Sequence, residues 1–163
     1  MRRFAALLLA ALLLLPAGCG EKSTEGLLLY YPTTRVDSGA ALVGQPYAGD
    51  TDPDPETLLR ALLSGPSQED LTSPFPKGTA LQGCTWDPDD PGNLLVTLSE
   101  PYSELTDVAL TLADYSIVLT LSQLDGVQTV EITAPGLRAG RRSHLKLAKE
   151  EAVLGSEELG GRS

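Results

Sequence analysis

The chain has 163 residues, which fits a single domain, and its 12 Lys and Arg against 22 Asp and Glu give a formal net charge of −10. This acidic balance excludes a nucleic-acid-binding protein, which needs a basic surface to replace the counterions of the phosphates. Two cysteines and one histidine are too few ligands for a zinc finger, ribbon or cluster, and we expect no cofactor and no metal.

The N-terminus has the pattern of an export signal. Two arginines precede 12 apolar residues, Phe4 to Leu15. A helix of that length reaches about 18 Å, well short of a bilayer core of about 30 Å, which is the size of a signal peptide rather than of a membrane span. The next residues, Leu-Pro-Ala-Gly-Cys at positions 15–19, resemble the lipobox of bacterial lipoproteins, with Pro16 as a departure from the usual pattern.

The lipobox resemblance implies a signal peptide over residues 1–18, a lipid such as palmitate on Cys19 and a tether over residues 19–26. It also implies a location on the extracytoplasmic face of the cell membrane. The alternative is an ordinary secretory cleavage after Ala17 or Gly18, with Cys19 incidental.

The first expected element of the mature chain is a buried strand over residues 27–31, which Pro32 ends. A loop rich in Gly, Asp, Thr and Pro follows over residues 33–53, and we expect a short strand within it at 40–43.

A helix is expected to start at Pro55, because Asp54 can accept hydrogen bonds from free backbone N–H groups and proline fits the first helical position. Gly65 and Pro66 end it, since glycine tolerates a left-handed cap and proline cannot continue a helix. Its apolar face consists of Leu58, Leu59, Leu62 and Leu63.

Two alternating segments, 79–86 and 93–99, predict an antiparallel hairpin closed by the turn at 87–92. Residues 104–124 lack Gly and Pro and predict a helix, and residues 127–133 predict a last strand. The order β-α-β-β-α-β predicts an α+β fold, with a small mixed sheet of about four strands and two helices on one face.

Beyond the last strand, residues 137–163 are expected to form a flexible charged tail with one short helix near 143–153. The single histidine, His144, lies in this tail, so Cys84 has no evident base beside it. We therefore interpret Cys84 as a small buried side chain on a strand.

The acidic run at residues 50–54 resembles the opening of a calcium loop, but Pro55 and Ala61 stand where such a loop needs Gly and Glu. The sequence also lacks Ser-x-x-Lys, Gly-x-Ser-x-Gly and Gly-rich phosphate-loop motifs. We expect no catalytic residues and predict that the protein is not an enzyme.

Three runs, taken in order, resemble the GerMN domain family of sporulation and spore-germination lipoproteins. They are ALLSGP at 61–66 leading to LTSPFPKGT at 71–79, LLVTLS at 94–99, and SIVLTL at 116–121 with GVQTVEI at 126–132. The resemblance covers roughly residues 27–136. It implies a wedge similar to the ring-building motifs of secretion and engulfment complexes, with no catalytic residues.

The leading hypothesis is a membrane-anchored lipoprotein whose single GerMN-like domain mediates protein interaction or assembly in sporulation or spore germination. Its partners would be the membrane, through the lipid on Cys19, and an envelope protein or a second copy. The alternative is a cell-wall-remodelling enzyme or accessory factor, which only export supports.

Overall fold

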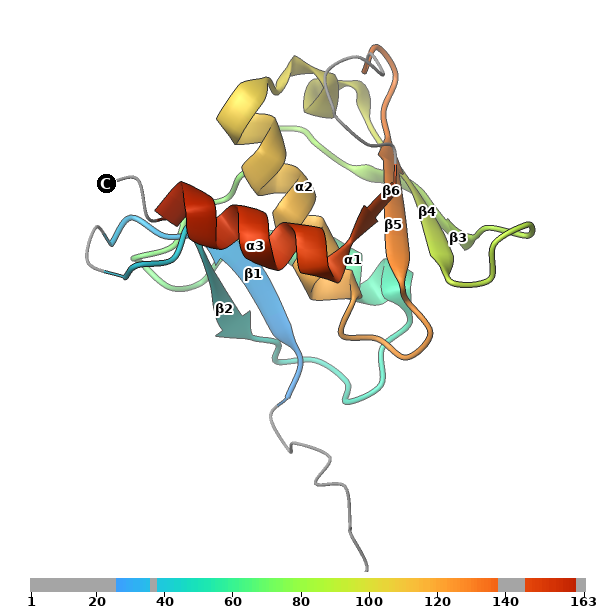
Figure 1. The fold of residues 1–163 in the computed structure, drawn as a ribbon, viewed down its shortest axis with the longest axis horizontal. Coiled ribbons are helices and arrows are strands. Elements are labelled where there is room, and N and C mark those ends of the chain that lie inside the picture. Colours follow the sequence, from blue (N-terminus) through green and yellow to red (C-terminus); the bar gives the residue numbers. More distant parts are fainter. Residues whose placement is uncertain (1–25, 36–37, 138–145, 161–163) are drawn as a thin grey trace, which may run out of the picture.

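The computed structural model describes residues 26–35, 38–137 and 146–160 (Figure 1). Strands and helices alternate along the chain, so the α+β class predicted from the sequence is confirmed. In chain order, the elements are β1 (Leu28–Pro32), β2 (Leu42–Pro46), α1 (Pro55–Leu63), β3 (Leu81–Trp86), β4 (Asn93–Leu98), the short 3₁₀ helix η1 (Glu100–Glu104), α2 (Asp107–Leu121), β5 (Thr129–Thr133), β6 (Lys146–Ala148) and α3 (Lys149–Gly160).

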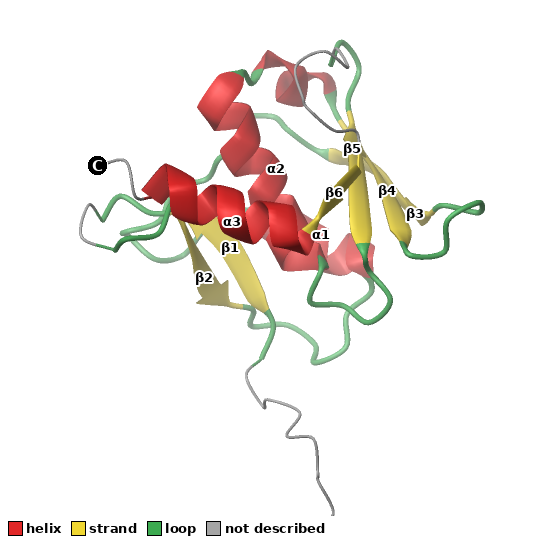
Figure 2. Ribbon diagram, viewed as in Figure 1, coloured by secondary structure: helices red, strands yellow, loops and turns green. Residues whose placement is uncertain are grey.

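The strands form two separate sheets, one of four strands in the order β3-β4-β5-β6 and one of β1 and β2 (Figure 2). The predicted antiparallel hairpin is β3–β4, and α2 connects the parallel pair β4–β5. The mixed sheet of about four strands is confirmed, but the strand predicted at residues 27–31 does not belong to it. That strand pairs with β2, and β6 supplies the fourth strand instead.

The inner face of the four-stranded sheet carries apolar side chains that line up across the strands. In one row, β4 places Leu94 beside Val130 of β5, which in turn faces Leu147 of β6. Trp86 of β3 stands at the other end of this row, opposite Leu94. Because α1 packs against β3 and α2 against β5, the core lies between this face and the helices.

Helix α1 begins and ends where the sequence predicts. The Asp54 carboxylate accepts a hydrogen bond from the Thr57 N–H at 2.9 Å, and Pro55 occupies the first turn. Gly65 follows the helix with a φ of +92°, a left-handed conformation that glycine adopts without a steric penalty. The helix is thereby held at both ends, and it turns its leucines toward the core.

Helix α2 confirms the helix expected within residues 104–124 and is covered on every side along most of its length. From Leu110 to Leu121 each residue is buried or half-buried. β1, α1, β5 and α3 all pack against α2. The buried residues of α2 are mostly apolar, with Asp114, Ser116 and Thr120 as the polar exceptions, so α2 is the centre of the domain.

The expectation of a flexible charged tail over residues 137–163 is wrong for residues 146–160, which form β6 and α3, although α3 overlaps the short helix expected near 143–153. Leu147 is 9% exposed, and Ala152 on α3 is fully buried. At the end of α3, a Cβ added to Gly160 would lie 2.8 Å from the backbone nitrogen of Ala41, so the helix seats closely against the chain entering β2. A three-residue strand shows no alternation that sequence reading could detect, which is why β6 was not predicted.

We predict that Leu62→Asp unfolds the domain. Leu62 is 0% exposed on the core side of α1, and an unpaired carboxylate there must lose its hydration or take up a proton, at a cost of several kcal/mol. A domain of this size has about 5–15 kcal/mol of stability in all. Thermal melts followed by circular dichroism measure the effect. Arg60→Asp, an exposed change on the same helix, is the control, and a wild-type melt for Leu62→Asp would contradict the core assignment.

Candidate functional site

The predicted lipid-attachment residue, Cys19, and the tether through residue 25 lie outside the described residues. The described chain starts at Gly26 and enters β1 two residues later. A force or restraint applied by an anchor would therefore reach the domain at the start of β1. We call the residues that fix this point the entry junction, and they are Leu27, Leu28, Tyr47 and Gln123.

Two sets of hydrogen bonds hold the entry junction. On one side the Tyr47 N–H donates to the Leu27 carbonyl at 2.7 Å, which continues the β1–β2 pairing. On the other side, the side-chain amide of Gln123 binds the backbone of Leu28 twice. Its Oε1 accepts from the Leu28 N–H at 2.9 Å and its Nε2 donates to the Leu28 carbonyl at 2.7 Å.

Side chains from the end of α2 thus take the place of a neighbouring strand along β1. Further along β1, the Tyr30 N–H donates to the hydroxyl of Thr120 at 3.1 Å. Gln123 Nε2 is also within 3.2 Å of the Leu119 carbonyl and 3.0 Å of the Thr120 carbonyl, so the amide is oriented by the helix end that carries it. Sequence reading missed Gln123 because its place in the predicted helix gives no signal of a partner more than ninety residues away.

We predict that Gln123→Ala lowers the free energy of unfolding by about 1–3 kcal/mol, because it leaves backbone groups of Leu28 without partners in a half-buried place. Urea denaturation measures the change. Gln68→Ala, at an exposed glutamine whose side chain has no bond to a described residue, is the matched control. Equal stability of the two variants would show that the junction is held by β2 alone.

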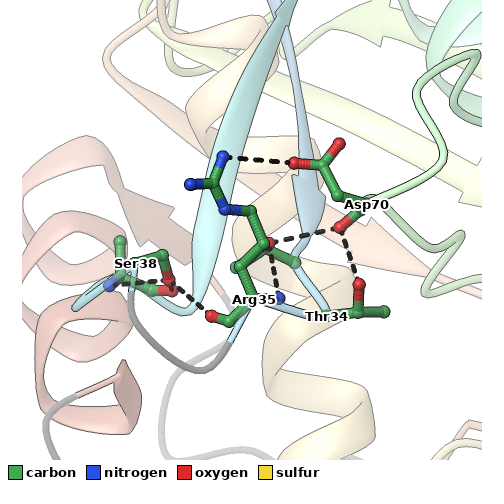
Figure 3. A network of polar contacts seen from close by, with 6 residues as sticks. Thr34, Arg35, Ser38 and Asp70 are labelled. Atoms are coloured by element: carbon green, nitrogen blue, oxygen red, sulfur yellow. Dashed lines mark hydrogen bonds and ion pairs between the residues drawn. The ribbon is translucent and has the colours of Figure 1, made fainter.

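A network of polar contacts pins the loop after β1 to the loop after α1 (Figure 3). The Thr34 N–H and hydroxyl both donate to the Asp70 carbonyl, at 2.9 and 3.2 Å. Arg35 lies 3.7 Å from the Asp70 carboxylate, and Ser38 donates to the Arg35 carbonyl at 3.0 Å. The ion pair is exposed and is worth at most about 1 kcal/mol, so the network serves to order the loops.

The acidic run at residues 50–54 contributes a helix cap. Hydrogen bonds from the Thr57 backbone and hydroxyl lower the pKa of Asp54, while Asp50 and Asp52 are exposed. Within residues 26–35, 38–137 and 146–160, no three His, Cys, Asp or Glu side chains are grouped closely enough to hold a metal ion.

The turn between β3 and β4 is tied to the C-terminal segment by Lys146. Its ammonium group lies 3.1 Å from the Asp90 carboxylate and 3.6 Å from that of Asp87. Asp87 also accepts from the Asn93 amide at 3.1 Å, and this bond is the main reason that the pKa of Asp87 is lowered. These aspartates lie in the turn predicted at residues 87–92, and the structure adds the lysine of β6 that pairs with them.

Cys84 is a half-buried residue in the middle of β3 rather than a fully buried one. Burial of its thiol, followed by the Glu56 and Asp54 carboxylates, raises the pKa of Cys84 to about 11. The thiol is therefore protonated at neutral pH, and it does not meet the requirement of a catalytic cysteine, which is a stabilised thiolate.

We predict that Cys84 alkylates about 100-fold more slowly at pH 8 than a free cysteine, because its pKa lies about 2 units above the reference value of 9.0 and only the thiolate reacts. Iodoacetamide labelling of the Cys19→Ala protein, followed by mass spectrometry, measures the rate, with glutathione as the reference. Labelling of the folded protein as fast as glutathione would contradict the raised pKa.

The described residues define an α+β domain in which helices cover one face of a mixed four-stranded sheet, beside a two-stranded ribbon. In the part of the chain that the structure describes, no helix is both long and apolar enough to cross a bilayer.

The profile of the Germane family, described as "Sporulation and spore germination", matches residues 28–139. The chain belongs to this family, as its resemblance to GerMN domains predicts.

Solved structures of the sporulation protein GerM from Bacillus subtilis share this fold. The first GerMN domain superposes with a TM-score of 0.54 at 16% sequence identity. The superposition covers 76% of this chain and 98% of the GerMN domain. The tandem GerMN domains give a TM-score of 0.54 at 13% identity over 77% of this chain. This chain spans only 47% of the tandem structure. A search of curated protein sequences finds no match.

Proposed function

We propose that this chain is a lipoprotein, anchored through Cys19 to the extracytoplasmic face of the cell membrane, whose single GerMN-type domain mediates protein interaction in sporulation or spore germination. The observation that carries the proposal is membership of the Germane family directly behind a lipobox-like signal. An envelope protein or a second copy would be the partner. Export alone supports the alternative, a cell-wall-remodelling enzyme or accessory factor.

The entry junction supports an anchored role. Because the tether joins the domain at β1, and β1 is bonded on both edges, the domain would be carried by a fixed strand rather than by a loose end. The polar residues singled out from the sequence also have structural partners, since Asp54 caps α1 and Asp87 orders a turn. These roles fit a domain that works through its surface.

We predict that Cys19→Ala moves the protein from the membrane to the soluble fraction without changing its melting temperature, because the lipid is attached outside the folded domain. Stable retention needs two or more acyl chains, so loss of the modified residue should abolish it. Carbonate washing of membranes, followed by immunoblotting, measures the distribution. Cys84→Ala is the matched control and should stay in the membrane.

The biological role is tested in the same strains. Cells that lack the chain should yield fewer heat-resistant spores or germinate more slowly. The wild-type protein and Cys84→Ala should restore the defect, and Cys19→Ala should not. Membrane retention of Cys19→Ala would refute the lipid anchor, whereas normal spores in the absence of the chain would refute the role in sporulation.

A further inference from the structure

Each sheet edge of the described chain except that of β3 is protected in a recognisable way. The edge of β1 is bonded by Thr120 of α2 and by Gln123, which follows the helix, and β2 ends in Pro46. β6 has three residues and leads directly into α3. Short strands, prolines and covering side chains are the devices by which proteins prevent unwanted strand pairing.

β3 is the exception, because it has six residues and contains neither a charge nor a proline. A β-bulge between Leu81 and Gly83 protects the start of the strand, whereas the pairing from Gly83 to Trp86 is regular. β3 is the outermost strand at one margin of the four-stranded sheet, and no further strand lies beyond it in Figure 1, while α1 packs against it. Gln82, Thr85 and Trp86 are exposed, and Cys84 is half-buried.

The backbone of β3 has hydrogen-bonding groups free for a further strand. The Asp87 N–H donates to the Asn93 carbonyl at 3.0 Å, and ladder bonds in an antiparallel pair recur at alternate residues. The N–H and C=O groups of Trp86 and Cys84 therefore point away from β4. Among the described residues, none forms a hydrogen bond with these four groups.

The surroundings of this edge define the chemistry of its partner. Trp86 is 42% exposed and lies against Gly126, where an added Cβ would be 3.7 Å from the indole. An indole face attracts lysine and arginine. Carboxylates lie on two segments that adjoin β3. Asp87, Asp89 and Asp90 lie in the turn that follows Trp86, where Asp87 and Asp90 reach Lys146 of β6, and Asp54 and Glu56 lie at the start of α1, which packs against β3.

Cations on the domain neutralise only part of this charge. Lys146 pairs with Asp87 and Asp90, and Arg60 pairs with Glu56 at 2.6 Å. Asp54 and Asp89 form no ion pair with any described residue. Because α1 packs against β3, Asp54 and Glu56 at the start of α1 lie on an element that adjoins the strand.

We propose that the outer edge of β3 is a docking site for an extended basic segment of a partner protein, which adds a strand beside β3 and places a lysine or arginine near Trp86 and the flanking carboxylates. Main-chain bonds to Cys84 and Trp86 would supply affinity, and the charges would select the partner. A second copy of the chain fits poorly, because it would bring one acidic edge against another. The inference rests on the interaction role proposed above and specifies its surface.

The test uses photo-crosslinking of the full-length chain in cells that express it. Gln82→benzoylphenylalanine places the reactive group on β3, and Gln68→benzoylphenylalanine, at an exposed glutamine after α1, is the matched control. We expect an adduct from position 82 but not from position 68. Mass spectrometry of the adduct should identify a linked segment that contains lysine or arginine.

A variant that removes a backbone N–H, together with its control, then separates strand addition from simple side-chain contact. Cys84→Pro removes one outward N–H, and proline is tolerated on an edge strand where the N–H faces solvent. Cys84→Ala keeps the N–H and is its control. We expect Cys84→Pro to reduce the yield of the position-82 adduct about tenfold and Cys84→Ala to leave it unchanged. Two further variants, Trp86→Ala and Asp89→Lys, change exposed residues. Each should reduce the yield of the position-82 adduct about fivefold, and this test holds even if Cys84→Pro fails to fold.

The outcomes distinguish this inference from the proposed function. An adduct from position 68 alone, an acidic linked segment, or a linked segment from a second copy would overturn the β3 assignment while leaving an interaction role intact. Unchanged yields in folded Cys84→Pro, or in both Trp86→Ala and Asp89→Lys, would also overturn it. No adduct from either position, in growing or sporulating cells, would count against both proposals.

Discussion

The structure depends on one constraint, which is that α2 has no side to turn toward water along most of its length. A helix that is covered on every side must be enclosed by other elements, and a single small sheet can cover only one of its sides. The chain meets this requirement with four different neighbours, β5, α1, β1 and α3. The separate ribbon β1–β2 and the C-terminal helix are therefore parts of the domain rather than additions to it.

The same constraint explains how polar side chains are used. Where α2 meets β1, the contact is between a helix and a strand edge, and the unpaired backbone groups of that edge need partners when they leave water. Thr120 and Gln123 supply them from the helix itself. Gln45, which is buried on β2, likewise accepts from the backbone N–H groups of Ser67 and Gln68 beyond α1. Cys84 is a free thiol, so these contacts join segments that no disulfide links among the described residues.

Local sequence signals predicted the elements whose causes are local. Asp54, Pro55 and Gly65 set the limits of α1, and the proline-bearing turn set the β3–β4 hairpin. The pairing of β1 with β2 instead of with the main sheet was not predictable in this way, because both strands would bury an apolar face in either arrangement. β6 was missed for a related reason, since the edge of β5 that it joins exists only after α2 has folded across.

The residues of the candidate site likewise differ in whether a local sequence signal predicts them. Cys19 is predicted from a motif and lies outside the described residues, so its role remains a prediction. Gln123 is visible only in the structure, since its partner Leu28 lies far away in the sequence and a glutamine near a helix end has many possible roles. The position of β3 at a sheet edge could not be read from the sequence either, because the strand order decides which strand lies at the margin.

The arrangement of the entry junction has a mechanical consequence. A pull on the chain before Leu27 that runs along the axis of β1 meets hydrogen bonds on both edges of the strand, and these bonds run across that axis. The hydrogen bonds then share the load in shear, and they are not broken one after another. Gln123 transfers part of this load directly to α2, the most enclosed element of the domain. A strand seated in this way resists extraction by a pull along its length, because many bonds must break together before the strand can leave.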